Sequence, residues 1–161
     1  MNSRINNTNF SLNFIIILSI FILDRLSKIY VIFLSNKLNN TEIFLSKYLN
    51  IYLIWNEGVG FGLFAFDNKF YYHILTVIIM IITIIVFYYM FKTDGIEKYS
   101  FTMIAGGSIG NIFDRMYYFA VPDFIDIHYE NIHWFIFNVA DIFITSGVIL
   151  LIIFELILKK K

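Results

Sequence analysis

Apolar residues fall into four long stretches along the chain, and the clearest of them contains no charged residue. It lies between Lys69 and Lys92, which leaves 22 uncharged positions. About 20 apolar residues span the core of a bilayer as a helix, so this stretch predicts a transmembrane helix. The other three stretches are interrupted by only a few ionisable residues each. The predicted fold class is an all-α membrane protein whose four transmembrane helices cover about residues 14–34, 70–91, 99–121 and 135–158.

The longest predicted loop, about residues 35–69, contains a strand pattern followed by a glycine-rich turn. The segment YLNIYLIW alternates and is rich in β-branched and aromatic residues, which predicts a short strand near 49–55 on the membrane surface. In the NEGVGFG segment that follows, no Lys-Ser/Thr pair continues the glycines, so a tight turn is expected rather than a nucleotide-binding loop. The chain shows no internal repeat or linker, so one domain over residues 1–161 is expected.

Composition agrees with a membrane protein. The chain is 59% hydrophobic and 15% charged, with a mean hydropathy of +0.73, whereas about a quarter of the residues in a soluble domain are charged. Biased nucleotide composition could favour Ile over Ala, but it would not remove charges from long stretches. Twelve basic residues balance 12 acidic ones, so a nucleic acid partner is not expected. The absence of Cys excludes disulfides, thiol nucleophiles and Cys-ligated metals.

Basic residues near the helix ends predict the orientation in the membrane, because they concentrate on the cytoplasmic side. One set of ends carries six basic residues, and the other set carries three that are spread along the long loop. Both termini are therefore expected in the cytoplasm, and the long loops and the active site at the extracytoplasmic face. The first set is Arg4, Lys92, Lys98, Lys159, Lys160 and Lys161, and the second is Lys37, Lys47 and Lys69.

Ionisable residues also occur inside the predicted helices, where they are costly and usually face the bundle interior. In the first helix, Asp24 and Lys28 are four residues apart and can form an ion pair on one face; a purely structural pair is the alternative. In the third helix, Gly106 and Gly110 form a GxxxG pair that predicts a close helix contact. Polar residues that share a face just after these glycines are Asn111, Asp114 and Arg115.

Two further aspartates are expected to meet near the outer interface. Pro122 ends the third helix, so Asp123 should lie where the chain leaves that helix. Asp141, which follows Asn138 by three positions, should lie about seven residues, or about 10 Å, into the fourth helix. Two adjacent carboxylates share a proton, and such a pair could activate water and polarise an amide carbonyl. The alternative is that each Asp caps a helix or is solvated.

Other catalytic chemistries have weaker support. None of the three histidines belongs to an HExxH motif, so a zinc protease is not expected. Ser27 and Ser108 have no convincing general base in reach. The loop residues that are most simply solvated are Asp126, His128 and His133. The expected activity therefore needs no metal and no cofactor.

Two non-peptidase classes remain as alternatives. A proton or ion transporter could use Asp24, Asp114 and Asp141, but its site should lie near the midplane, often between inverted repeats. Here the best polar cluster is expected at one interface, and no repeat is visible. In a structural membrane subunit, the same polar groups would only hold helices together.

The chain contains five motifs in this order: LDRLSK at 23–28, NEGVGFG at 56–62, GGSIGNIFDR at 106–115, VPDFID at 121–126 and FNVAD at 137–141. Together they resemble the lipoprotein signal peptidase family, signal peptidase II. The resemblance implies a bacterial inner-membrane aspartic endopeptidase with four transmembrane helices and a small extracytoplasmic β cradle. It implies cleavage of prolipoproteins immediately before their diacylglyceryl-modified Cys. The expected partners are these prolipoproteins and membrane lipid, and the expected state is a monomer.

Carried over motif by motif, the resemblance places the catalytic pair on Asp123 and Asp141. This chain departs from the family pattern at Pro122, at Val59-Gly60 and in WFIFN, where a small aliphatic residue, two Ala and a Trp-Pro pair are usual. None of these departures removes a catalytic candidate. The resemblance implies substrate-binding or supporting roles for Asp24, Lys28, Asn56, Gly58, Asn111, Asp114, Arg115 and Asn138.

Overall fold

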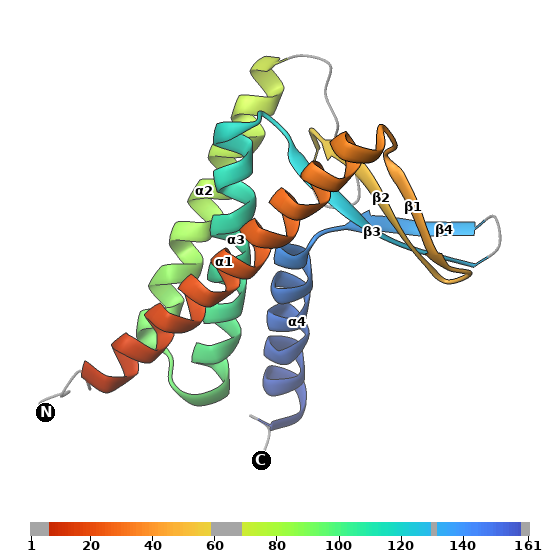
Figure 1. The fold of residues 1–161 in the computed structure, drawn as a ribbon. Helices are drawn as coiled ribbons and strands as arrows, with labels where there is room; N and C mark the ends of the chain where they lie inside the picture. Colours follow the sequence, from red (N-terminus) through yellow and green to blue (C-terminus); the bar gives the residue numbers. More distant parts are fainter. Residues whose placement is uncertain (1–6, 59–68, 130–131, 159–161) are drawn as a thin grey trace, which may run out of the picture.

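The computed structural model describes residues 7–58, 69–129 and 132–158. Residues 59–62 of the predicted glycine-rich turn and the basic residues at the chain ends, Arg4, Lys159, Lys160 and Lys161, lie outside these residues. Within them the chain forms four α-helices and one four-stranded antiparallel sheet (Figure 1). A mostly helical fold with a small sheet is therefore confirmed.

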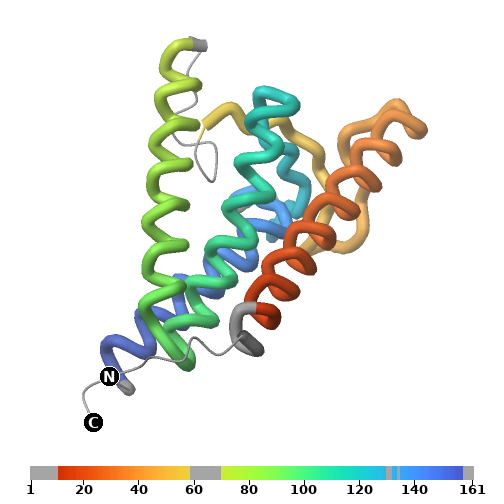
Figure 2. The backbone as a smooth tube through the Cα atoms, turned by 90° about the vertical axis from the view of Figure 1, so that its left-hand side faces the viewer, coloured from red at the N-terminus to blue at the C-terminus, as the bar shows by residue number. Residues whose placement is uncertain are grey.

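Helix α3 is the centre of the bundle, because it packs against each of the other helices. The N-terminal end of α1, the α2–α3 connection and the C-terminal end of α4 lie at one end of the bundle, away from the sheet (Figure 2). The helices are α1 (Asn7–Leu38), α2 (Lys69–Lys92), α3 (Gly95–Tyr117) and α4 (Val139–Ile153), the last continued by a π-helical turn (Phe154–Leu158).

Glycines set how closely α3 approaches its neighbours. A Cβ atom at Gly106 would lie 3.0 Å from a side chain of α1, and one at Gly110 would lie 2.6 Å from a carboxylate oxygen of Asp24. The close helix contact predicted for this glycine pair is confirmed. Gly107, which was not singled out from the sequence, faces α4, where a Cβ atom would lie 2.5 Å from the carbonyl oxygen of Ala140.

The sheet lies beside the C-terminal half of α1. Its strand order is β1-β2-β3-β4, and buried Val31 of α1 packs against Leu53 and Phe124 of the sheet. The strand predicted near 49–55 is confirmed as β2, whereas the other three strands were not predicted. The strands are β1 (Glu42–Ser46), β2 (Leu49–Asn56), β3 (Val121–Tyr129) and β4 (Ile132–Phe137).

Two predicted helix boundaries are wrong in ways that move the candidate site. Helix α3 ends at Tyr117 instead of 121, and the chain turns at Phe119, whose φ is 59°. Pro122 then lies in β3, because its fixed φ suits an extended chain and Trp55 is its partner on β2. Helix α4 begins at Val139 instead of 135, because the aromatic and β-branched segment before it pairs with β3.

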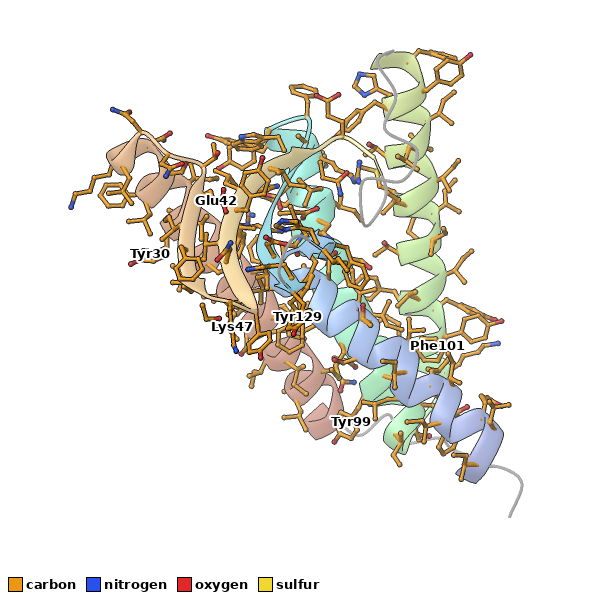
Figure 3. All side chains as sticks on the ribbon, turned by 90° about the vertical axis from the view of Figure 1, so that its right-hand side faces the viewer. Tyr30, Glu42, Lys47, Tyr99, Phe101 and Tyr129 are labelled. Carbon is orange, nitrogen blue, oxygen red and sulfur yellow. The ribbon has the colours of Figure 1, made fainter. Side chains whose placement is uncertain are left out.

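The helices α2 and α4 present apolar side chains outward. Two stretches of described residues, Phe70–Lys92 and Val139–Ile157, are long and apolar enough to cross a membrane. Side chains stand away from the bundle along the outer side of α2 (Figure 3), and Ile84 there is 67% exposed. An aliphatic surface of this kind is typical of contact with lipid. Exposed aliphatic residues on α2 include Ile74, Val77, Ile78, Ile81, Ile82, Ile84 and Ile85.

Candidate functional site

Asp141 lies in the first turn of α4, held by a capping box. The backbone N–H of Asn138 donates to Oδ2 of Asp141 at 3.2 Å, and the backbone N–H of Asp141 donates to Oδ1 of Asn138 at 3.1 Å. This reciprocal arrangement satisfies two backbone donors that a helix start would otherwise leave unpaired. It also fixes the Asp141 carboxylate at the point where β4 ends and α4 begins. The prediction that Asp141 lies two turns into a helix is therefore wrong.

Asp123 lies on β3 and is only 1% exposed. Its Oδ1 accepts a hydrogen bond from Nδ2 of Asn138 at 2.6 Å, and its Oδ2 accepts one from Nδ2 of Asn56 at 2.8 Å. Asn138 therefore contacts both aspartates, through its side-chain amide on Asp123 and through its backbone and side-chain oxygen on Asp141. The sequence prediction that these two carboxylates lie close together is consistent with this shared partner.

The environment of Asp123 disfavours its charged form. Burial is the largest cause that raises the pKa of Asp123 from 3.8 to about 6, and the nearby Asp141 carboxylate is the second. The hydrogen bonds from Asn138 and Asn56 act in the opposite direction, because they stabilise the carboxylate. Asp123 can therefore exchange a proton near neutral pH, whereas a solvated Asp would be fully ionised there.

A chain of hydrogen bonds connects Asp141 to a buried lysine. Nδ2 of Asn111 donates to Oδ1 of Asp141 at 2.8 Å, and Nζ of Lys28 donates to Oδ1 of Asn111 at 3.0 Å. Because the ammonium group can only donate, it determines which end of the Asn111 amide faces Asp141. Each oxygen of both aspartates thus has a hydrogen-bond donor.

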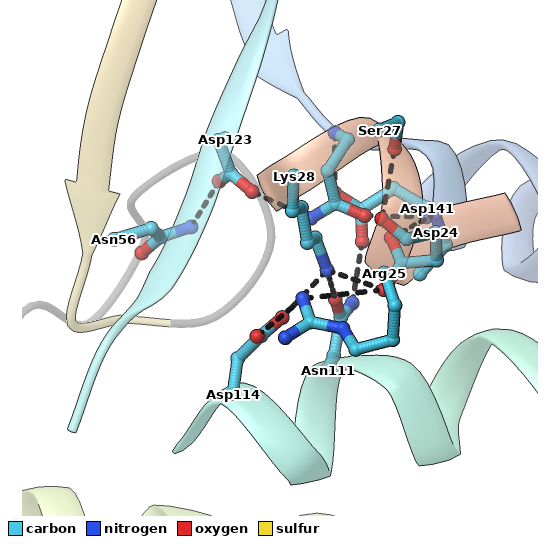
Figure 4. A network of polar contacts seen from close by, with 11 residues as sticks. Asp24, Arg25, Ser27, Lys28, Asn56, Asn111, Asp114, Asp123 and Asp141 are labelled. Carbon is cyan, nitrogen blue, oxygen red and sulfur yellow. Dashed lines mark hydrogen bonds and ion pairs between the residues drawn. The ribbon is translucent and has the colours of Figure 1, made fainter. Parts of the chain in front are cut away.

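Lys28 belongs to a group of four buried charges between α1 and α3 (Figure 4). Its Nζ lies 2.8 Å from Oδ2 of Asp24 and 2.7 Å from Oδ2 of Asp114. Arg25, which sequence reasoning missed, lies 2.5 Å from Oδ1 of Asp114. The predicted ion pair between Asp24 and Lys28 is confirmed. Two acidic and two basic side chains cancel, which lowers the cost of burying them.

Asp24 also connects this group to α4. Its Oδ1 accepts a hydrogen bond from the backbone N–H of Ala140 at 3.1 Å. A carboxylate at the N-terminus of a helix satisfies an unpaired donor and interacts favourably with the helix dipole. Because Ala140 directly precedes Asp141, this contact helps to place the candidate carboxylate.

Arg115 joins α3 to the segment after β2. Its guanidinium donates to the carbonyl oxygen of Gly58 and lies 5.6 Å from the ring centroid of Tyr72. The backbone N–H of Gly58 donates to Oδ1 of Asn56 at 2.8 Å, which orients the Asn56 amide so that its N–H groups face Asp123. Arg115 is 4% exposed, so it supports this segment from inside the protein.

The three loop residues that were expected to be solvated, Asp126, His128 and His133, differ in their exposure to solvent. Asp126 is fully buried and His128 is 8% exposed, whereas the side chain of His133 is 50% exposed. The interpretation is wrong for Asp126 and His128, because β3 is an inner strand of the sheet and both of its edges are paired.

A cavity of about 260 Å³ opens beside Asp141. Its walls are mostly apolar, and Phe137 and Ile142 line it together with the Asp141 carboxylate. Two carboxylates with one proton between them can activate a water and polarise a carbonyl group, and this cavity gives Asp141 contact with the outside. The lining residues are Phe135, Phe137, Asp141, Ile142, Thr145 and Ser146.

Comparison with known proteins gives consistent matches. The family model described as signal peptidase (SPase) II matches residues 16–157. The lipoprotein signal peptidase of Pelagibacter ubique (strain HTCC1062) is 48% identical over 159 residues, which cover 99% of this chain and 96% of that protein. The lipoprotein signal peptidase of Francisella tularensis subsp. novicida (strain U112) is 35% identical over 121 residues, covering 73% and 75% of the two chains. A bacterial membrane enzyme solved by the in meso method at 2.3 Å resolution superimposes with a TM-score of 0.75 at 28% identity, covering 94% and 90%.

Proposed function

The chain belongs to the signal peptidase II family; it is a membrane peptidase that processes the signal peptides of prolipoproteins, and we propose that Asp123 and Asp141 are its catalytic pair. The observation that carries this proposal is the shared partner Asn138, which hydrogen-bonds both carboxylates. We further propose that the enzyme cleaves immediately before the diacylglyceryl-modified Cys of its substrate.

In the proposed mechanism, the pair holds one proton. The ionised Asp removes a proton from a water, whose oxygen attacks the scissile carbonyl carbon. The protonated Asp donates a hydrogen bond to the carbonyl oxygen and stabilises the charge that develops there. The tetrahedral intermediate then breaks its C–N bond as a proton passes to the leaving amine. Because the two carboxyl groups both activate the water and polarise the carbonyl, the mechanism requires neither a metal nor a cofactor.

The supporting residues have roles that follow from their contacts. Asn56 and Asn138 hold Asp123, while Asn111 holds Asp141. Lys28 orients the Asn111 amide, and Arg115 orients the segment that carries Asn56 through Gly58. Asp24 and Asp114 neutralise the buried cations. Because Asp24 and Asp114 are paired with cations in this way, neither carboxylate is a free proton acceptor of the kind that a transporter would need.

We also propose that all four helices cross the bacterial inner membrane as one domain. The charges in α1 and α3 support this topology, because they face inward and cancel instead of facing lipid. The bias of basic residues favours cytoplasmic termini, so the sheet and the aspartate pair lie near the extracytoplasmic face. The protein acts as a monomer, with membrane lipid against its exposed aliphatic surface.

The cavity beside Asp141 suggests how the substrate approaches. Its apolar walls suit a segment that arrives from the lipid phase, and the acyl chains of the substrate would remain in lipid between the helices. Its scissile bond would then reach the pair at the outer interface without leaving the membrane.

Cleavage of a synthetic diacylglyceryl-modified prolipoprotein peptide by the purified protein tests this function. Mass spectrometry should locate the cut immediately before the modified Cys. Asp123→Asn and Asp141→Asn should each abolish the product, whereas Asp94→Asn, whose side chain is 92% exposed, should retain full turnover. Product formation at the normal rate by either of the first two variants would refute the proposed pair.

A further inference from the structure

Strands β3 and β4 bring three side chains with metal-binding atoms together, away from the aspartate pair. Asp126, His128 and His133 each offer one ligand atom, and these atoms all lie within 4.8 Å of one another. A register irregularity after Ile127 places His133 directly opposite His128. Opposed residues in an antiparallel pair project to the same face, and the two rings stack with centroids 5.2 Å apart.

The three side chains are held in different ways. Nδ1 of His133 lies 3.1 and 2.9 Å from the two carboxylate oxygens of Asp126. Nδ1 of His128 lies 3.7 Å from Oδ2 of Asp126, which is too long for a hydrogen bond. Within the part of the chain that the structure describes, this buried nitrogen has no hydrogen-bond partner.

An unpaired imidazole nitrogen in a buried position is costly. His128 is 8% exposed and Asp126 is fully buried, so the surroundings give this nitrogen little access to water. A cation between the three side chains would satisfy the nitrogen and balance the buried carboxylate. Imidazole and carboxylate ligands together favour Zn²⁺ and similar transition-metal ions, whereas Mg²⁺ and Ca²⁺ prefer oxygen ligands alone.

We propose that Asp126, His128 and His133 form a binding site for a divalent transition metal of the Zn²⁺ class. Three protein ligands and one water complete a tetrahedral set. The half-exposed side chain of His133 provides the route by which the ion enters. The bound ion fastens β4 to β3, the strand that carries Asp123, and thereby stabilises the sheet without taking part in peptide hydrolysis.

Zn²⁺ titration of the full-length protein tests the site. The protein is purified without a polyhistidine tag in an uncharged detergent and freed of metal by chelation and dialysis. Calorimetric titration should show one Zn²⁺ per chain, and Zn²⁺ should raise the melting temperature by mass action. Co²⁺ at the same site should give the visible absorption of a four-coordinate ion.

His133→Asn is the informative variant. The Asn amide can still donate to Asp126, but it has no imidazole lone pair, so the local hydrogen bond is kept and the ligand is lost. Its Kd for Zn²⁺ should rise about tenfold or more. His73→Asn, which removes an exposed histidine of α2, is the matched control and should bind as the unmodified protein does.

Three results would overturn the proposal. The first is the absence of saturable Zn²⁺ binding by the unmodified protein. The second is an equal Kd for Zn²⁺ in the unmodified protein and in His133→Asn. The third is a loss of affinity in His73→Asn as large as that in His133→Asn. The first would leave His133 as a hydrogen-bonding partner of Asp126 and His128 without a metal. Because His133 is half exposed, its replacement should not prevent folding, and equal melting temperatures of the metal-free variants would establish this.

Discussion

Replacing Asp123 by Asn should change how protein stability depends on pH. The pKa of Asp123 is raised from 3.8 to about 6 in the folded protein, so folding favours its protonated form. Its contribution to stability is therefore fully present below pH 3.8 and is lost as the pH rises through 6. The full loss is about 3 kcal/mol, since one pKa unit corresponds to about 1.4 kcal/mol. Most of this loss, about 2–3 kcal/mol, falls between pH 4 and pH 7.

The Asn variant cannot ionise at this position, so the loss should be absent from it. A constant offset is expected as well, because the introduced amide would have one acceptor oxygen for the two amide donors, Asn56 and Asn138, that contact Asp123. This offset in the free energy of unfolding is about 1–3 kcal/mol and does not depend on pH. It therefore does not affect how the difference between the two proteins changes from one pH to another.

Reversible unfolding in mixed micelles measures both proteins from pH 4 to pH 7. The free energy of unfolding of the unmodified protein, minus that of Asp123→Asn, should fall by about 2–3 kcal/mol over this interval. Asp94→Asn, which alters a side chain that is 92% exposed, should give a nearly constant difference. A constant difference for Asp123→Asn would refute the reasoning, because it would mean that burial and Asp141 do not shift this carboxyl group.

Three further changes probe the scaffold and the chemistry. Arg115→Ala should destabilise the protein by about 2–3 kcal/mol, because it removes a charged donor from the Gly58 carbonyl. Lys47→Ala, which alters an exposed side chain, should change the free energy of unfolding by no more than about 0.5 kcal/mol, and equal melting temperatures of the two variants would contradict this. Gly107→Ala should cost about 1–3 kcal/mol and lower turnover, because its methyl group would push against Ala140; unchanged turnover would mean that α3 and α4 can separate without moving the site. EDTA should leave the rate of peptide cleavage unchanged well below the melting temperature, and loss of activity that added Zn²⁺ restores would contradict a metal-free mechanism.

Local spacing was enough to predict the features that depend on one helix or one strand. Asp24 and Lys28 are four residues apart, so helical geometry alone brings them together. The GxxxG spacing of Gly106 and Gly110 is also local, and it predicts a close helix contact without saying which helix is the partner. The alternation that predicts β2 is local in the same way.

Features that depend on strand pairing could not be predicted in this way. The burial of Asp126 follows from the pairing of β3 with β2 on one side and β4 on the other, and β2 lies far away along the chain. Arg25 was missed because its partner, Asp114, is on another helix. The start of α4, in contrast, was available from the sequence, because Asn138 and Asp141 have the spacing of a capping box.

The pH dependence of peptide cleavage tests most directly whether Asp123 and Asp141 share one proton. The rate of bond cleavage should be measured under single-turnover conditions, with a lipidated peptide and a detergent whose charges do not change across the range. The rate should rise and then fall with pH, because only the singly protonated pair is active, and the two limbs belong to the pair as a unit. The falling limb should lie near or above the pKa of about 6 that burial and Asp141 give to Asp123. A flat profile wherever the protein stays folded would contradict the shared proton and would favour a serine nucleophile instead.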